Sequence, residues 1–174
     1  GVCLNVGCIP SKALISAGHF LHRMKHDAAE MGLKYSGDVA VDMGQMQKWK
    51  QSVCDRMAGG VEQLLKGNGV VIKRGEASFK SATELAVKSA SGSEVIAAKN
   101  YILATGSRPV EIPGFAFDEK TVLSSTGALA LSERPKKVVV IGGGYIGLEL
   151  GSVLRNLGVE VTVLEAGKAL LAGV

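Results

Sequence analysis

Two cysteines near the start of the chain, Cys3 and Cys8, have four residues between them. Two thiols this close can form a redox disulfide or supply part of a metal site. In an ideal helix the Cα atoms of residues five apart lie about 8.6 Å from each other, whereas a disulfide needs roughly 4.4–6.8 Å. A bridge therefore requires the segment to depart from an ideal helix, and Gly7 and Pro10 make such a departure easy.

A helix is expected directly after this pair, because apolar residues recur at helical spacing over residues 12–30 and Ser11 can serve as its N-cap. A loop that carries thiols at the start of a helix lies near the positive end of the helix dipole. That position favours the reactive thiolate over the thiol. The residue types and their order therefore favour a redox disulfide.

A zinc site is the alternative use of the two thiols, and it would need further cysteine or histidine ligands. His19, His22 and His26 lie three and four residues apart on the predicted helix, where an exposed helical face explains them better. The third cysteine, Cys54, lies among apolar residues at helical spacing and is expected to be a packed core thiol. We therefore predict no metal.

A glycine-rich segment follows in the second half of the chain, where Gly142, Gly144 and Gly147 fit the pattern G-x-G-x-x-G. The apolar run 136–141 before them is typical of a strand. A helix is expected to about residue 157, and a second strand over 159–165. Such a β-α-β unit requires a parallel sheet. The glycine pattern alone is a weak signal, but in this context it predicts a dinucleotide-binding unit.

Each glycine has a physical task in this unit. Gly142 permits the tight turn, Gly144 lets the backbone approach a pyrophosphate, and Gly147 lets the helix pack on the strand. The start of the helix offers free N–H groups and a positive dipole end to the phosphates. Glu165, at the end of the second strand, can accept hydrogen bonds from both ribose hydroxyls of NAD and would repel the 2′-phosphate of NADP. The alternative is that the glycines only shape a turn and Glu165 is a surface charge.

Between these two motifs the sequence predicts a helix and a small antiparallel sheet. The helix covers residues 43–66 and ends at the sequence Gly-Asn-Gly. Three strand candidates follow, and they cover residues 70–79, 84–89 and 95–104. The last candidate ends in Ala104-Thr105-Gly106, and a loop with prolines then leads to a domain boundary after residue 112. The expected fold class is α/β with a small antiparallel β-meander.

The composition excludes several classes of protein. The 174 residues are 47% apolar and 21% charged, which is ordinary for a soluble globular chain. A scattered net charge of +4 and an aromatic content of 5% argue against a nucleic-acid partner. No run of about 18 uncharged apolar residues occurs, so no membrane-spanning helix is expected. Three cysteines without a secretory signal suit a reducing compartment. The chain begins with Gly1 rather than Met, and we expect a fragment.

Four segments together resemble one known family. Their sequences CLNVGCIPSKAL, ATGSRP, LSSTGAL and GGGYIGLE are similar in order and spacing to motifs of the pyridine nucleotide–disulfide oxidoreductases, and the first resembles the dihydrolipoamide dehydrogenases in particular. The resemblance covers essentially the whole chain. It implies a partial, Rossmann-like two-domain fold that binds FAD and NAD(P). Residues 1–112 would be the later part of the FAD-binding domain with the meander, and residues 113–174 the opening β-α-β part of the NAD-binding domain.

The resemblance also implies a role for each motif residue. Cys3 would exchange with dihydrolipoamide, and Cys8 would lie against the flavin. Lys12 would sit near flavin N5 and pair with Glu149, because a lysine buried beside a flavin needs a counter-charge. These four residues are the expected catalytic set. The residues expected to bind FAD or NAD are Lys12, Ala104, Thr105, Gly106, Gly142, Gly144, Tyr145, Ile146, Gly147, Glu149 and Glu165.

The implied partners are dihydrolipoamide on the lipoyl domains of acyltransferase components, and a second copy of the chain in a homodimer when full length. The implied location is the cytoplasm, or the mitochondrial matrix in a eukaryote. The family's first FAD fingerprint and its C-terminal His-Glu dyad lie outside this sequence, so the fragment alone is expected to be inactive and to bind FAD poorly. Tyr145 is shared with glutathione reductase. A sister enzyme, such as glutathione reductase or mercuric reductase, and a non-catalytic nucleotide-binding module therefore stay open as alternatives.

Overall fold

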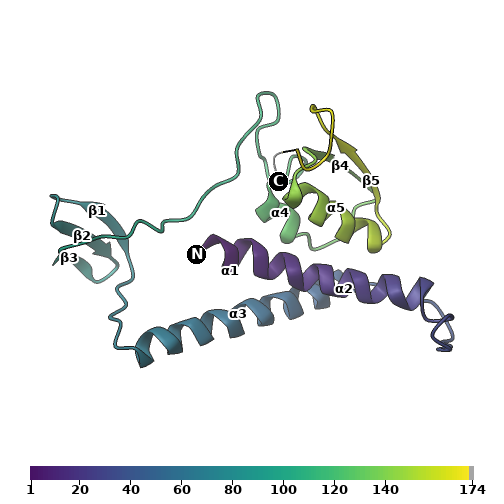
Figure 1. The fold of residues 1–174 in the computed structure, drawn as a ribbon, viewed down its shortest axis with the longest axis horizontal. Coiled ribbons are helices and arrows are strands. Elements are labelled where there is room, and N and C mark those ends of the chain that lie inside the picture. Colours follow the sequence, from purple (N-terminus) through teal and green to yellow (C-terminus); the bar gives the residue numbers. More distant parts are fainter. Residues whose placement is uncertain (173–174) are drawn as a thin grey trace. The chain divides into compact units, whose positions relative to one another are not determined.

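The computed structural model describes residues 1–172, and the chain divides into two compact units (Figure 1). The first unit combines residues 1–57 with residues 107–174, and the second holds residues 58–106. Each unit groups residues that contact one another more than they contact the rest of the chain. This division does not test the domain boundary predicted after residue 112, which stays a prediction. Both cysteines of the close pair and the glycine-rich segment belong to the first unit.

The cysteine segment is helical on both sides of a break at Gly7. Helix α1 (Val2–Val6) ends there, and helix α2 (Cys8–His26) begins at the next residue. Gly7 has φ −134° and ψ −110°, and a Cβ on it would lie 3.0 Å from the carbonyl oxygen of Val2. The expected departure from an ideal helix is confirmed.

The predicted start of the helix that follows the cysteine pair was wrong. Helix α2 begins at Cys8 with Gly7 as its N-cap, three residues before the expected N-cap Ser11. Pro10 does not prevent this, because in the first turn of a helix its missing N–H has no carbonyl partner to lose. Ser11 is instead buried inside the helix, at 6% exposure. The helix also ends at His26, four residues before the predicted end at 30.

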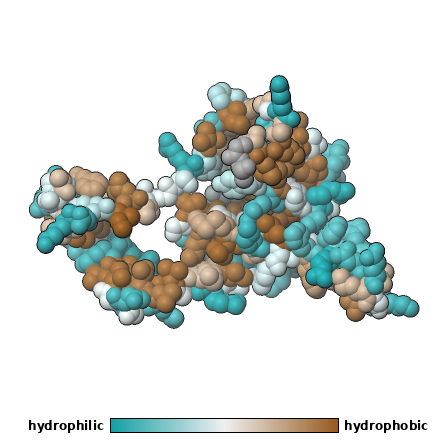
Figure 2. Space-filling view, viewed as in Figure 1, coloured by the Kyte–Doolittle hydropathy of each residue, from teal (hydrophilic) through white to brown (hydrophobic). Residues whose placement is uncertain are grey.

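A parallel β-α-β unit forms the C-terminal part of the first unit, as the sequence predicted. Strand β4 (Lys137–Ile141) pairs with β5 (Glu160–Leu164), and helix α5 (Tyr145–Asn156) connects them. Val139 of β4 is 57% exposed. Among the described residues α5 covers only one face of this two-stranded sheet, so apolar side chains lie open on the surface (Figure 2).

The core of the first unit joins the helices. Helix α3 (Met43–Gly67) has the predicted extent, and a short helix α4 (Ser125–Leu129) precedes the β-α-β unit. Gly18 lets α2 approach α5, because a Cβ there would already lie 3.4 Å from the Cβ of Asn156. The buried core cluster consists of Leu14, Leu21, Met43, Leu129, Val153 and Leu157.

The second unit contains an antiparallel meander of β1 (Glu76–Phe79), β2 (Glu84–Ser89) and β3 (Gly92–Ala97). Its existence confirms the predicted small sheet, but two of the predicted strands were too long. Neither residues 70–75 nor residues 98–104 pair with another strand within the described part of the chain. Ile102 is accordingly 93% exposed. An apolar sequence with high strand propensity forms a strand only where a neighbouring strand pairs with its backbone N–H and C=O groups.

None of the helices within residues 1–172 is long and apolar enough to cross a membrane.

Candidate redox and dinucleotide site

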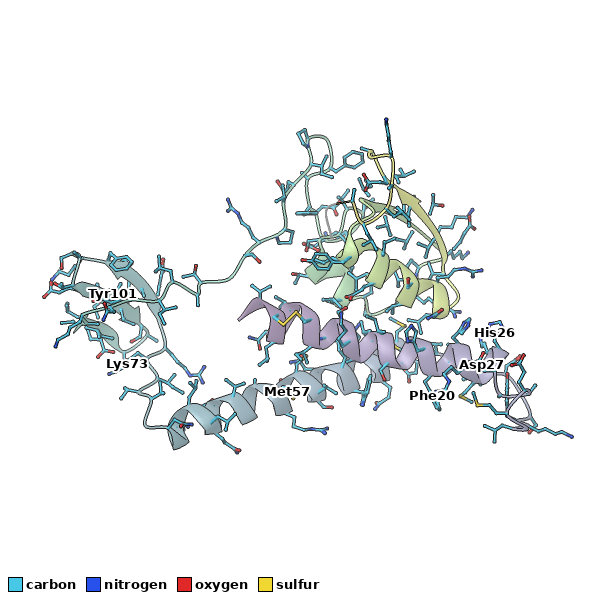
Figure 3. All side chains as sticks on the ribbon, viewed as in Figure 1. Phe20, His26, Asp27, Met57, Lys73 and Tyr101 are labelled. Atoms are coloured by element: carbon cyan, nitrogen blue, oxygen red, sulfur yellow. A yellow bond between two sulfur atoms is a disulfide. The ribbon has the colours of Figure 1, made fainter. Side chains whose placement is uncertain are left out.

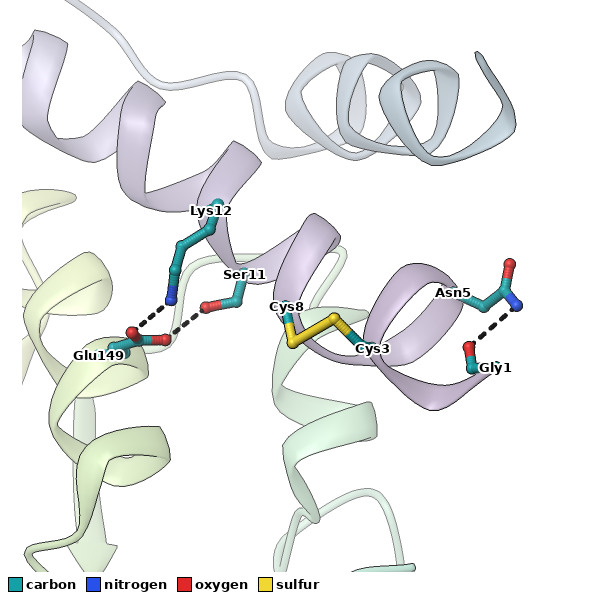
Figure 4. Close-up of a disulfide and its surroundings, with 7 residues drawn as sticks. All are labelled: Gly1, Cys3, Asn5, Cys8, Ser11, Lys12 and Glu149. Carbon is teal, nitrogen blue, oxygen red and sulfur yellow. Dashed lines mark hydrogen bonds and ion pairs between the residues drawn. A yellow bond between two sulfur atoms is a disulfide. The ribbon is translucent and has the colours of Figure 1, made fainter. Parts of the chain in front are cut away.

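Cys3 and Cys8 form a disulfide across the break at Gly7 (Figures 3 and 4). Their Cα atoms lie 4.6 Å apart, which is within the range that a bridge requires. Both residues are exposed, and no residue of α1 is buried. A dithiol in solution can therefore reach the bridge in this chain.

The electrostatic surroundings of the two sulfur atoms differ. Cys8 is the first residue of the 19-residue helix α2, so its Sγ lies at the positive end of the helix dipole. No acidic residue occupies the first turn of α2, where it would oppose that field. Cys3 belongs to the separate five-residue helix α1. The fold therefore favours a thiolate at Cys8 when the bridge is reduced.

Ser11 and Lys12, one turn into α2, both contact Glu149 of α5 (Figure 4). The Ser11 hydroxyl donates to Oε2 of Glu149 at 3.0 Å, and the Lys12 ammonium donates to Oε1. The hydrogen bond from Lys12 is the largest cause of the lowered pKa of Glu149. Burial opposes it, and the weaker hydrogen bond from Ser11 and the charge of Lys12 add to the lowering. The carboxylate is thus held ionised and joins residues 138 positions apart in the chain.

The ion pair was predicted on the assumption that Lys12 is buried, but neither side chain of the pair is buried in this chain. The side chain of Lys12 is 57% exposed and that of Glu149 33%. An exposed pair of this kind contributes little to stability. The contact of Ser11 was missed, since its place beside Pro10 suggested an N-cap. Once the helix is known to start at Cys8, the neighbouring positions of Ser11 and Lys12 indicate that both can reach one acceptor.

The glycine-rich segment has the shape that a dinucleotide phosphate requires. Gly142 adopts φ +105°, a left-handed conformation that favours glycine. A Cβ on Gly147 would lie 2.5 Å from the carbonyl oxygen of Gly142 and 2.9 Å from Cγ1 of Val140. A Cβ on Gly144 would meet nothing within 4 Å, which leaves open space at the start of α5. These residues therefore fit a pyrophosphate at the helix N-terminus.

Glu165 follows β5 and contacts the same segment. Its Oε1 accepts the N–H of Gly167 at 2.6 Å, and its Oε2 accepts the N–H of Gly143 at 2.7 Å. These two backbone hydrogen bonds, that of Gly167 first, lower the pKa of Glu165 and keep it ionised. An exposed carboxylate therefore stands at the edge of the glycine loop, and its contact with ribose stays a prediction. Tyr145 and Ile146, in the first turn of α5, are exposed at 59% and 47%.

The remaining predicted residues belong to other segments of the chain. Ala104, Thr105 and Gly106 are exposed at the end of the second unit, and Gly106 adopts φ +88°. Their role in FAD binding stays a prediction. His19, His22 and His26 lie on the exposed face of α2, and Cys54 is buried at 2% exposure, both as expected. Within residues 1–172 no three His, Cys, Asp or Glu side chains gather as metal ligands.

An apolar hollow of about 300 Å³ lies between α2 and α3. Ile9 and Ala13 line it from α2, and Trp49 and Val53 line it from α3. Ile9 directly follows Cys8 in the chain. The hollow therefore offers an apolar surface close to the bridge in sequence.

A parallel β-α-β unit with a glycine loop, linked through Glu149 to a helix that starts at an exposed disulfide, defines a redox protein built on a dinucleotide-binding fold. The family model described as pyridine nucleotide-disulphide oxidoreductase matches residues 1–174. The chain belongs to this family.

Curated relatives include two bacterial proteins named dihydrolipoyl dehydrogenase. The protein of Geobacillus stearothermophilus is 53% identical over 99% of this chain, and that of Bacillus subtilis is 52% identical over 99%. In both cases the match covers 36% of the relative, so the chain spans about a third of their length. A relative named mitochondrial dihydrolipoyl dehydrogenase, from Schizosaccharomyces pombe, is 50% identical over 95% of this chain and 32% of its own length.

Solved structures show the same fold. LpdA from Mycobacterium tuberculosis matches with a TM-score of 0.87 at 21% identity, over 97% of this chain and 37% of its own. The flavoprotein disulfide reductase RclA from Escherichia coli matches with a TM-score of 0.77 at 28% identity, over 99% of this chain and 35% of its own. The fold is therefore a partial α/β fold of flavoprotein disulfide reductases.

The glycine loop predicts opposite effects for two matched substitutions. Gly147→Ala should lower the free energy of unfolding by about 1–3 kcal/mol, because its Cβ meets the backbone of Gly142. Gly144→Ala should leave stability almost unchanged, because its Cβ enters open space. Urea unfolding of the full-length protein measures both. Equal loss in the two variants would contradict the assigned packing.

The ionised state of Glu149 predicts a pH dependence of stability. A carboxyl group with a lowered pKa in the folded state stabilises the protein above its ordinary pKa of 4.5, and this contribution disappears as pH falls through the folded-state pKa. The wild type should therefore be slightly more stable than Glu149→Gln at pH 7, by less than about 1 kcal/mol, and lose this advantage on acidification. Thermal unfolding of both proteins across that range is the measurement. An advantage that grows on acidification would refute the assignment.

Proposed function

We propose that the full-length protein is a flavin-dependent disulfide oxidoreductase that oxidises dihydrolipoamide to lipoamide with NAD⁺. The observation that carries this proposal is the exposed Cys3–Cys8 bridge at the start of α2, joined through Ser11 and Lys12 to Glu149 on the helix of the glycine loop. The names of relatives at 50–53% identity support the choice of substrate.

The bridge and the dihydrolipoamide dithiol react by thiol–disulfide exchange. One substrate thiolate attacks Sγ of Cys3, the Cys3–Cys8 bond breaks, and Sγ of Cys8 leaves as a thiolate. The second substrate thiolate then attacks the substrate sulfur of the mixed disulfide and releases lipoamide and the Cys3 thiolate. Two electrons pass to the protein, and the two substrate protons go to solvent or to the new thiolates. Cys8 is the better leaving group because the positive end of α2 stabilises its thiolate.

Two cofactors complete the reaction in this proposal. When bound, FAD would supply an acceptor for the electron pair of the reduced bridge, and NAD⁺ would supply the final acceptor. On this chain, Lys12 and the segment Ala104–Thr105–Gly106 contribute to the FAD site, in the domain of residues 1–112. The NAD site lies in the domain of residues 113–174 and uses Gly142, Gly144, Tyr145, Ile146, Gly147, Glu149 and Glu165.

The Lys12–Glu149 pair orients the lysine side chain, because its ammonium group donates to Oε1 of Glu149. With Glu149 ionised, the second contact from Ser11 restricts the carboxylate to one orientation. In the proposed function Lys12 is thus an oriented positive charge one turn from Cys8. There it favours a negative charge on Sγ of Cys8, the sulfur expected to lie against the flavin.

The proposed substrate is carried on lipoyl domains of acyltransferase components, and the proposed assembly is a homodimer. An apolar lipoyl arm suits the apolar hollow beside Ile9. The proposed location is the cytoplasm, or the mitochondrial matrix in a eukaryote, and the name of the yeast relative supports the second case. No nucleic acid and no membrane take part in the proposed reaction.

The function is tested by turnover of the full-length flavoprotein with dihydrolipoamide and NAD⁺, compared with glutathione disulfide and NADPH. Turnover is expected with the first pair alone. Cys3→Ser and Cys8→Ser should each lower kcat by at least about a hundredfold, because neither variant can form the bridge. Cys54→Ala is the matched control, a buried thiol outside the bridge, and should keep kcat. Turnover with the second pair alone would assign the chain to a sister enzyme.

Glu165 sets the expected preference for NAD⁺ over NADP⁺. Glu165→Gln removes the negative charge that opposes a 2′-phosphate but keeps an acceptor for a backbone N–H. The ratio of kcat/KM for NAD⁺ to that for NADP⁺ should fall by about tenfold or more. The control is Glu160→Gln, a carboxylate earlier on β5 that pairs with Lys137. An unchanged ratio in Glu165→Gln would exclude Glu165 from coenzyme selection.

A further inference from the structure

Helix α4 carries the motif LSSTGAL, to which the proposed reaction gives no task. The helix has only five residues, too few to be stable alone in water. It packs against α1, which carries Cys3, and against α5, which carries Glu149. In Figure 4 the short helix drawn in pale green next to the bridge is this segment. The contacts that hold α4 in place can therefore influence the position of the Cys3–Cys8 bridge.

The C-terminal end of α4 is held by two side chains of α3. The Lys50 ammonium donates to the carbonyl oxygen of Leu129 at 2.8 Å and to Oε1 of Gln47 at 2.6 Å. The Gln47 amide donates to the carbonyl oxygens of Leu129 and Leu131 at 3.1 and 3.0 Å. A cation at the last carbonyl groups of a helix satisfies them and complements the negative end of its dipole.

The N-terminal end of α4 has the complementary arrangement. The Ser124 hydroxyl accepts the N–H groups of Thr126 and Gly127, and the Glu119 carboxylate accepts the N–H of Ser124 at 3.3 Å. A Cβ on Gly127 would lie 1.8 Å from Oε2 of Glu119, so the missing side chain makes room for this carboxylate. A negative group thus lies at the start of α4 and a positive group at its end.

Lys50 is an unusual residue for this place. It is only 8% exposed, and no carboxylate within residues 1–172 forms an ion pair with it. Burial lowers the pKa of Lys50, with a smaller opposing effect of the neighbouring Cys54. A buried ammonium without a counter-ion costs free energy, whereas an apolar side chain of that length would not. Its polar contacts all serve α4 and Gln47, which indicates a task at that helix end.

We propose that Lys50 is a positioning residue for the Cys3–Cys8 bridge. By holding the terminal carbonyl group of α4, it fixes the short helix on which α1 rests. Helix α1 has no buried residue of its own, so its place depends on its continuity with α2, on the disulfide to Cys8 and on its contact with α4. The inference deepens the proposed function, because it concerns the sulfur atom that the dithiol attacks. A shift of about 1 Å at a reacting atom can slow a reaction by orders of magnitude.

The test measures how fast dithiothreitol reduces the bridge in the full-length protein, well below its unfolding temperature. Samples are quenched with a thiol-alkylating mass tag, and the labelling of Cys3 and Cys8 is read by peptide mapping. Lys50→Met keeps the length of the side chain without its charge and should slow reduction about tenfold. Lys50→Arg restores a cation and should react within about threefold of the wild type. Lys48→Met, on the exposed side of α3, should match the wild type.

Wild-type rates in Lys50→Met would overturn the inference while leaving the proposed function intact. Equal slowing in Lys50→Arg and Lys50→Met would also overturn it, because a cation would then not be what matters. A wild-type bridge that dithiothreitol cannot reduce would overturn both the inference and the proposed function. If Lys50→Met does not fold, Glu119→Gln is the deciding variant, because it removes the charge at the other end of α4. It should slow reduction about twofold to threefold. A wild-type rate in Glu119→Gln would overturn the inference.

Discussion

The bridge between Cys3 and Cys8 depends on the interruption of the helix at Gly7. In an uninterrupted helix their Cα atoms would be about 8.6 Å apart, too far for a disulfide, and the break reduces this distance to 4.6 Å. The same break makes Cys8 the first residue of α2, so one constraint produces both the bond and the electrostatic difference between its sulfur atoms. An isolated five-residue helix is the cost of this arrangement, because α1 must take its position from its neighbours.

A second constraint links the redox segment to the glycine loop. Ser11 and Lys12 follow Cys8 by one turn of α2, and Glu149 follows Gly144 by one turn of α5, so their contact fixes the two helix starts relative to each other. The close approach of these helices at Gly18 makes the contact reachable. An exposed ion pair adds little stability, and its value in this fold is orientation. The start of α2 at Cys8 and the glycine loop at the start of α5 are therefore connected through this contact.

The sequence predicted those features that depend on local pattern. The β-α-β unit, helix α3 and the meander follow from periodicity. The task of Gly142 follows from its left-handed backbone conformation, and that of Gly147 from packing too close for a side chain. The start of α2 was missed because a proline usually marks a boundary, yet Pro10 is tolerated in a first turn. The strand ends at residues 70–75 and 98–104 depend on partner strands, which no local pattern reveals. Lys50 could have been noticed from its spacing of four to the core residue Cys54, but its contacts with Leu129 need the tertiary structure.

Redox chemistry at Cys3 and Cys8 is the central claim, and peptide mapping of the full-length protein tests it most directly. The oxidised protein is alkylated, unfolded and digested, before and after treatment with one equivalent of dihydrolipoamide without oxygen. We predict that the peptide with Cys3 and Cys8 is bridged before treatment and carries two alkyl groups afterwards, while Cys54 stays protected in the folded protein because it is 2% exposed. Free thiols at Cys3 and Cys8 in the oxidised protein, or a bridge that survives the dithiol, would contradict the account.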